Sequence, residues 1–373
     1  MLLGGLFRRP LPLSMAEPAP RVTRPSPSGS PSGTLVAHLL AGSWRADPPP
    51  LPSSEPDALA EILPFLLASG SGALAWSRIR SDPRLAATPA GLALHDAYRH
   101  AVIDAAVRER RIVDVVRRLR ADGIEPMLFK GRAAATAYAT PACRPGGDID
   151  LLLRPEDEGQ AEAVLEEEVR LLVVDLNHGH LVREQERAGL FARAGHLEFG
   201  GVAVTVPSPE DHLRLLALHA LAHGVARPFW LSDVAAWVEA RQEGFDWSAA
   251  QSADPRTAER VRVALGLAHQ LLGMRPEGTP VEHGASPPRW AGSALLRRWA
   301  DPRNATPMRP WSHGPLRSLP LALAQRWPPD PVLEAVRNGR RFSRWPRLPF
   351  SVADAARRAF RHDRSPAGTP RRP

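Results

Sequence analysis

A short alternating run, Asp148-Ile149-Asp150, constrains this chain more than any other stretch. It opens an apolar segment, Leu151–Leu153, that is typical of a buried β-strand. Because successive side chains of a strand point to opposite faces, Asp148 and Asp150 share one face while Ile149 points into the protein. Two carboxylates held side by side repel each other unless a cation lies between them. The stretch therefore predicts a site for a divalent ion, and Mg²⁺ or Mn²⁺ suits such oxygen ligands.

A second strand and a tight turn are expected just before this one. Met127–Phe129 form an apolar run that stops at Lys130-Gly131, and Ala133–Tyr138 then read as a short helix. Backbone N–H groups at Gly131 are thereby expected at a helix N-terminus, which is a favourable place for a phosphate.

Lys130 is unusual for its residue type. It is the only lysine among 48 basic residues, and the other 47 are arginines. A compact ammonium acts as a point charge, whereas a guanidinium is a planar fork, so the position favours a lysine that reaches a phosphate. Survival of one lysine by chance is the alternative.

The Asp-x-Asp pair alone is a weak signal, because such pairs are also common on solvated strand ends and turns. The order of strand, Lys-Gly turn, short helix, arginine, Gly-Gly and Asp-x-Asp strand is more specific. In this order, written LFKGRAAA and then RPGGDIDLLL, the chain resembles the uncharacterised bacterial nucleotidyltransferases of the DNA polymerase β-like superfamily. The resemblance covers about residues 90–270.

The resemblance implies an α+β fold, in which a small mixed sheet of the polymerase β-like nucleotidyltransferase fold is flanked by N- and C-terminal helical segments. It also implies a metal-dependent enzyme that moves a nucleoside monophosphate from a nucleoside triphosphate to an unidentified hydroxyl-bearing acceptor, a small molecule or a protein, and releases pyrophosphate. In the resembled group an acid on a later strand completes the metal site. Asp175, in the expected strand Leu171–Leu176, matches that acid. Asn177 intervenes before His178, where the group more often has a histidine, so the role of His178 and the register of Asp175 stay open.

The implied site contains two sets of residues. Asp148, Asp150 and Asp175 are the expected catalytic residues and metal ligands, and Asp175 is the expected proton acceptor for the acceptor hydroxyl. Glu198 is a rival third carboxylate, although an exposed strand position suits it better. The residues expected to bind the triphosphate are Lys130, Gly131, Arg132 and Arg144.

Two other functions remain open at this stage. One is a catalytically silent protein of the same fold that acts as a binding or regulatory partner through its basic tail. The other is hydrolysis or phosphoryl transfer at the same metal site.

Composition and periodicity predict five regions. They are a disordered Pro/Ser-rich N-terminus (1–50), a helical segment (51–122), the nucleotidyltransferase core (123–207), a helical bundle (208–274) and a basic Pro/Arg/Trp-rich C-terminal region (275–373). Met15 is an alternative start to Met1.

Within these regions several elements are expected. Two short helices, interrupted at Pro64 and at a Gly-Ser cluster, precede a long helix over 91–121. An acidic helix is expected from Pro155 to about Val169, and a hairpin turns at Gly200-Gly201. Further short helical pieces are expected near 315–326, 331–338 and 351–361.

The helix that begins after Ser208 carries three histidines, His212, His219 and His223. A pair spaced i, i+4 can bind zinc, but packing within a helical bundle is the better interpretation because no glutamate follows His219. Asp233, on the next helix, either caps that helix or lines the acceptor side of the cleft, and the cap is favoured.

The net charge of +8 is unevenly distributed. Residues 281–373 hold 18 arginines against six acidic residues, whereas residues 1–280 carry a balance of −4. Arginine mixed with tryptophan is compatible with binding of RNA or single-stranded DNA, with a tail that packs on the rest of the protein, or with contact to an acidic partner. Nucleic-acid binding is not favoured, because the sequence contains no recognisable nucleic-acid-binding module.

The remaining composition bears on compartment. The single cysteine, Cys143, excludes an internal disulfide and fits a reducing cytoplasm, and it is interpreted as a small loop residue. No run of 18 apolar residues occurs, so no membrane-spanning helix is expected.

Overall fold

The computed structural model describes residues 31–51, 55–171, 173–176, 184–284, 287–305, 330–337 and 342. Its only β-sheet within this part of the chain is five-stranded and mixed, with the strand order β3-β2-β1-β5-β4. The strands are β1 (Met127–Leu128), β2 (Ile149–Leu152), β3 (Val174–Leu176), β4 (Gly195–Phe199) and β5 (Val202–Val206). The expected α+β class with a small mixed sheet is confirmed.

Strand pairing places the acidic segment on an internal strand, β2, next to the edge strand β3. β2 pairs antiparallel with β1 and parallel with β3, and β1 pairs parallel with β5. β4 and β5 form the expected hairpin, and Gly200 and Gly201 adopt positive φ angles at its turn. The hairpin prediction is therefore confirmed.

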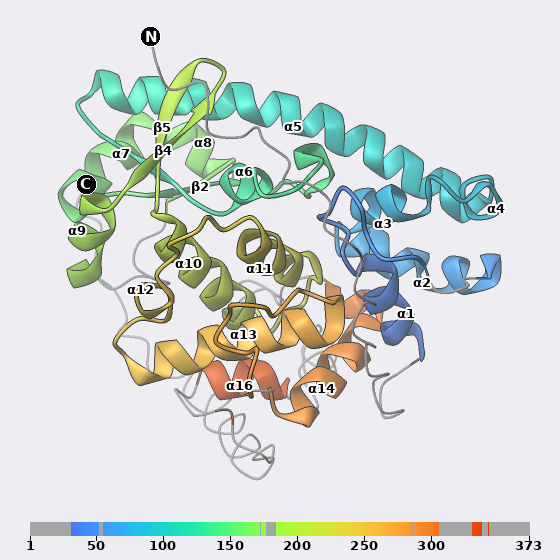
Figure 1. Ribbon diagram of the computed structural model, residues 1–373. Helices are drawn as coiled ribbons and strands as arrows, with labels where there is room; N and C mark the ends of the chain where they lie inside the picture. The colour runs from blue at the N-terminus through green and yellow to red at the C-terminus, as the bar shows by residue number, and fades with distance from the viewer. Residues whose placement is uncertain are drawn as a thin grey trace, which may run out of the picture.

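The two faces of the sheet pack against different helices. On one face, Ile149 and Leu151 join a core with Ile112 and Val116 of α5 (Pro89–Ala121). On the other face, Leu152 packs with Leu215 of α10 (Pro209–Ala222). Figure 1 shows the sheet between the long α5 and the helices around α10 and α11 (Phe229–Glu239). Asp150, which alternates with Ile149 and Leu151, consequently lies on the α10 side.

Several of the expected helices are found, among them the short helix after the Lys-Gly turn, which is α6 (Gly131–Ala135). The long helix predicted over 91–121 is confirmed as α5, which begins after Thr88, whose hydroxyl accepts the Gly91 N–H. α10 is capped by Ser208 with Pro209 next to it, as expected. In the C-terminal region α16 (Pro331–Arg337) lies where a helix is expected.

The remaining helices surround these elements. They are α1 (Pro31–Leu40), α2 (Pro56–Ala68), α3 (Gly72–Ile79), α4 (Pro83–Ala86), α7 (Glu158–Val164), α8 (Glu166–Arg170), α9 (Glu184–Ala192), α12 (Trp247–Gln251), α13 (Pro255–Leu272) and α14 (Arg289–Trp299). Short 3₁₀ turns lie at Pro141–Cys143, Pro155–Asp157 and Pro302–Ala305.

The prediction of disorder over residues 1–50 is wrong for residues 31–50. Pro31–Leu40 form α1, and its Val36 and Leu40, together with Trp44, are buried in the main hydrophobic core. The prediction was based on the Pro, Ser and Gly residues of this region. These residues surround a short apolar run, which packs onto other helices and becomes ordered. Residues 1–30 lie outside the described part of the chain.

Some element boundaries also differ from expectation. Pro64 lies inside α2 and does not interrupt it; the chain breaks at Ser69–Ser71, and α4 is an additional short helix. The acidic helix is divided at Leu165 into α7 and α8, and the third strand starts at Val174 rather than at Leu171. The pieces expected near 315–326 and 351–361, and His178, lie outside the described residues.

One hydrophobic core joins the helices that precede the sheet in the chain with the helices that follow it. Leu66 of α2, Leu74 of α3, Leu216 of α10, Val234 of α11 and Leu265 of α13 belong to the same buried cluster. Trp299 of α14 and Val332 of α16 join it from the C-terminal region. The described part of that region therefore packs on the body. The five predicted boundaries stay predictions, but the N-terminal helices and the bundle share their interior.

A glycine pair tests the packing of α1. A Cβ at Gly33 would come within 1.7 Å of the Leu296 carbonyl oxygen of α14, whereas a Cβ at Gly159 of α7 meets nothing within 4 Å. We expect Gly33→Ala to lower the free energy of unfolding by about 1–3 kcal/mol, because backbone must shift to admit the methyl group. Gly159→Ala should be neutral or stabilising by up to about 1 kcal/mol. Chemical denaturation measures both, and equal effects would contradict the packed position of α1.

Candidate metal centre

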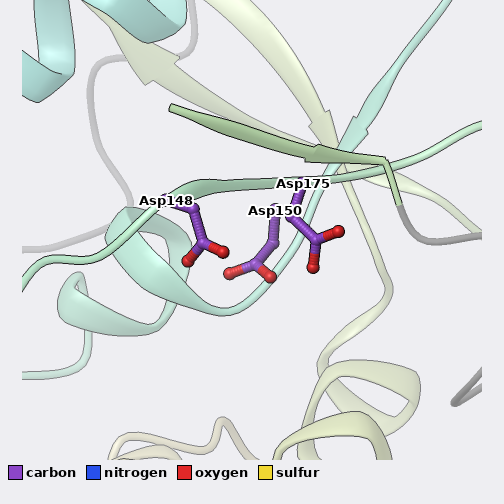
Figure 2. A group of neighbouring side chains, drawn as sticks. All are labelled: Asp148, Asp150 and Asp175. Atoms are coloured by element: carbon purple, nitrogen blue, oxygen red, sulfur yellow. The ribbon is translucent and has the colours of Figure 1, made fainter. Parts of the chain in front are cut away.

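Three carboxylates lie close together at the N-terminal end of β2. Asp148 immediately precedes β2, Asp150 lies within it, and Asp175 lies in β3. One carboxylate oxygen from each residue lies within 4.8 Å of the others (Figure 2). Among the described residues this is the only group of three or more acidic, histidine or cysteine side chains spaced to hold a metal ion. The structure thus brings the three predicted acids together.

Strand register explains the convergence. Asp150 is the direct partner of Asp175 in the parallel pairing of β2 with β3, so both side chains leave the sheet on the same face. Ile149 and Val174 alternate with them and enter the core under α5. The three side chains in Figure 2 point in a common direction, away from that core. The expected neighbourhood of the two strands is therefore observed, with Asp175 in register.

Glu198 is not a third ligand. It lies exposed on β4, and β1 and β5 separate that strand from β2. The rival assignment to Glu198 is wrong, because the hairpin turns its strand to the opposite edge of the sheet.

Lys130 forms an ion pair with one of the three acids, Asp150. Its Nζ lies 2.6 Å from Oδ1 of Asp150, and both side chains are buried. Burial raises the pKa of Asp150 to about 6; Lys130 opposes this shift, while Asp148 and Asp175 add to it. The ammonium thus compensates part of the negative charge, and the two exposed acids add charge that Lys130 does not pair.

The turn that carries Lys130 is strained. Lys130 has φ 56° and ψ −149°, and Gly131 has φ 42°. A lysine in this region costs about 1–3 kcal/mol and is kept only where the surroundings impose it. The Lys130 N–H donates to Nε2 of the buried His212 at 3.1 Å. Burial, followed by the charge of Arg144, lowers the pKa of His212 to about 3, so this ring is a neutral acceptor that holds the turn.

The donor set fits Mg²⁺ or Mn²⁺. It consists of carboxylate oxygens alone, which these hard cations prefer, and it contains neither the thiolate nor the imidazole that favours zinc. Burial raises the pKa of Asp150, and the neighbouring charges of Asp148 and Asp175 raise it further; a bound divalent cation would relieve both effects.

Arg144 forms its ion pair with an acid outside the group of three, Asp233 of α11. Its guanidinium donates to both carboxylate oxygens of Asp233, at 3.1 and 2.8 Å, and the Tyr138 hydroxyl donates to Oδ1 at 2.7 Å. Asp233 lies within α11, after an N-cap at Pro228, so the interpretation of Asp233 as a helix cap is wrong. Asp233 thus holds Tyr138 and Arg144, which lie between α6 and β2 in the chain, against α11.

Arg132 and Gly131 have different surroundings. Arg132 pairs with Glu109 of α5 at 3.3 Å and donates to the Pro141 carbonyl. Gly131 begins α6, and its Cα position faces the Asp148 carbonyl oxygen, which an added Cβ would meet at 3.9 Å. Of the four residues predicted for the triphosphate, Lys130 and Gly131 lie beside the acids, and Lys130 is paired with one of them. Arg132 and Arg144 pair with acids outside the group of three.

Three residues near the acids were missed by sequence reasoning. His212 was interpreted only as a packed histidine, and no spacing rule connects it with the turn 82 residues earlier. Burial lowers the pKa of Arg108 of α5 and of Arg227, between α10 and α11, and the charge of Asp148 opposes this shift in both. In a chain with 47 arginines, nothing in the sequence distinguishes these two.

The other candidate chemistries have structural explanations. The His219 and His223 rings lie 4.6 Å apart and both contact Trp230, which agrees with packed histidines. Cys143 is buried, and burial raises the pKa of its thiol to about 11, so it stays protonated near neutral pH. Among the described helices, none is both long and apolar enough to span a membrane.

Comparison with known families agrees with this geometry. The family described as "Uncharacterised nucleotidyltransferase" matches residues 60–169 and 168–273, which is more than half of the chain and includes all three acids. The chain belongs to this family. Searches among curated proteins and among solved structures found no match.

The family match extends beyond the sheet. Its first segment starts within α2 and its second ends at Gly273, directly after α13. The matched residues therefore include helices that precede and helices that follow the sheet in the chain, and these helices share one hydrophobic core. The C-terminal helices α14 and α16 lie outside the matched residues.

The pKa of Asp150 predicts how metal binding depends on pH. A carboxylate must lose its proton to bind the ion, so protons compete with metal below about pH 6. We expect the affinity for Mn²⁺, measured by electron paramagnetic resonance, to rise about tenfold per pH unit between about pH 5 and 6 and to level off above pH 7. Glu198→Gln should keep this profile. An affinity that is constant from pH 5 to 7 would contradict the assignment of Asp150 as a ligand.

The Asp233 contacts predict a large effect on stability. Asp233→Ala leaves a buried guanidinium and a buried hydroxyl without their acceptor, and removal of one partner of such a pair costs about 3–5 kcal/mol. Asp96→Ala is a matched control, because Asp96 pairs with Arg99 on the exposed face of α5, where a loss of at most about 1 kcal/mol is expected. Urea denaturation of both variants measures the difference, and similar losses would contradict the role of Asp233.

Proposed function

We propose that this chain is a metal-dependent nucleotidyltransferase that moves a nucleoside monophosphate from a nucleoside triphosphate to a hydroxyl-bearing acceptor and releases pyrophosphate. The observation that carries the proposal is the convergence of Asp148, Asp150 and Asp175 on one face of adjacent strands. Membership of a nucleotidyltransferase family supports it. The acceptor is a small molecule or a protein.

The three acids have distinct roles in this proposal. Together they hold Mg²⁺ or Mn²⁺, which when bound neutralises triphosphate charge and favours attack at the α-phosphorus. Asp150 is buried against Lys130 and therefore serves as a fixed ligand. Asp175 is exposed, which suits a group that also meets the acceptor.

The proposed transfer balances as a single displacement. The acceptor oxygen forms a bond to the α-phosphorus, and Asp175 takes the hydroxyl proton. The bond between the α-phosphorus and its bridging oxygen breaks, and the electron pair leaves with pyrophosphate. Lys130 and Gly131 lie beside the acids, and the ammonium of Lys130 and the N–H of Gly131 are assigned to the triphosphate. Arg144 and Arg132 support the site through Asp233 and Glu109. The single cysteine fits a reducing compartment such as the cytoplasm.

Label transfer tests the proposed reaction. The full chain is incubated with Mg²⁺, cell extract and each nucleoside triphosphate labelled at the α-phosphorus. We expect one class of molecule to acquire label as pyrophosphate forms, and Asp150→Asn to reduce the rate more than about 100-fold because a metal ligand is lost. Glu198→Gln, which removes an exposed carboxylate from β4, should react like the wild type.

Other results have defined meanings. Release of orthophosphate or a nucleoside diphosphate would replace the proposal with hydrolysis or phosphoryl transfer. No product with any nucleotide, together with no stabilisation by Mg²⁺ and nucleotide in a thermal-shift assay, would leave a silent protein of this fold.

A further inference from the structure

Two arginines near the acidic site form no ion pair with a carboxylate of the described residues, although the charge of Asp104, four residues before Arg108 on α5, acts on Arg108. Arg108 lies on α5 and Arg227 lies between α10 and α11, and both side chains are half-buried. Neither makes an ion pair or hydrogen bond with any residue in the described ranges, and the Nε of each is buried without an acceptor. Arg132 and Arg144, in contrast, are both paired with acids. Half-buried guanidinium groups without acceptors are costly unless a ligand supplies them.

Arg108 lies directly beside the segment that leads into β2. An added Cβ on Gly146 would lie 2.3 Å from its Nη2 and 2.5 Å from its Cζ. The guanidinium therefore covers Gly146, two residues before Asp148. Glycine at this position admits the arginine, and any side chain would displace it.

Arg227 is held over aromatic rings. Its Cζ lies 5.8 Å from the centre of the Trp230 ring and 6.0 Å from that of Phe229, and such stacking holds a guanidinium without using its N–H donors. Burial lowers the pKa of both Arg108 and Arg227, and the charge of Arg144 lowers both further. The charge of Asp148 acts on both in the opposite direction, as does that of Asp104 on Arg108. Both cations thus lie within electrostatic reach of the exposed ligand Asp148.

The chemistry of the pair identifies the ligand class. A guanidinium fork matches the oxygens of a phosphate, and two forks from separate elements suit a ligand with several linked phosphates. We propose that Arg108 and Arg227 bind the β- and γ-phosphates of the nucleoside triphosphate, the part that leaves as pyrophosphate. This inference rests on the proposed function, and it gives these two arginines the role that the sequence assigned to Arg132 and Arg144.

Calorimetric titration with inorganic triphosphate and excess Mg²⁺ tests the site without requiring a reaction. Arg108→Gln and Arg227→Gln should each weaken binding about tenfold or more, because a charge-assisted hydrogen bond is lost. Arg110→Gln is the matched control, since it removes the same charge from an exposed position on α5 and should change binding less than about twofold. Circular dichroism verifies folding, and Mn²⁺ affinity at the three acids should stay within about threefold of the wild type.

A glycine pair provides an independent test. Gly146→Ala displaces the flexible end of Arg108 and should weaken triphosphate binding by nearly as much as Arg108→Gln, whereas a Cβ at Gly147 meets nothing within 4 Å and Gly147→Ala should bind normally.

The outcomes separate this inference from the reaction. Triphosphate binding that is absent in the wild type, or unchanged in both arginine variants, overturns the inference even if label transfer occurs. Binding that depends on both arginines supports it even if no acceptor becomes labelled, in which case only the proposed transfer fails.

Discussion

The parallel pairing of β2 with β3 is the interaction on which the site depends. It sets Asp150 opposite Asp175 and turns both carboxylates to the same face, while the residues between them enter the core under α5. A shift of one residue would reverse both sets of side chains and bury the carboxylates among apolar residues. Hydrophobic packing on the α5 side therefore fixes the register, and the register places the ligands.

Charge compensation around this face is organised in layers. Lys130, held by a strained turn and by the neutral ring of His212, pairs with the buried acid. Farther out, Asp233 anchors Arg144 from α11, so the helical bundle and the sheet share one polar network as well as one hydrophobic core. The strain at Lys130 is of the kind that persists where a side chain must occupy one place. This network connects the segment before β2 with α11, and both lie within the family match.

Much of the sheet and its acids could be predicted from local patterns. The alternation in Asp148-Ile149-Asp150, the Gly-Gly hairpin and the periodicity of α5 are short-range signals that tertiary packing did not override. The family resemblance supplied Asp175, because no rule of spacing identifies an acid on a separate strand. The sequence could not reveal the partner of Arg144 or the acceptor role of His212, since each depends on residues more than 80 positions away. The Pro, Ser and Gly content of residues 1–50 led to a prediction of disorder, whereas α1 is stabilised by contacts with residues distant in the chain.

Direct observation of a bound ion tests the central claim best. Crystals of the full chain grown with Mn²⁺ should show an anomalous scattering peak within coordination distance of oxygens from Asp148, Asp150 and Asp175, with Lys130 beside it. The absence of a peak at saturating Mn²⁺, or a peak held by other residues, would contradict the account.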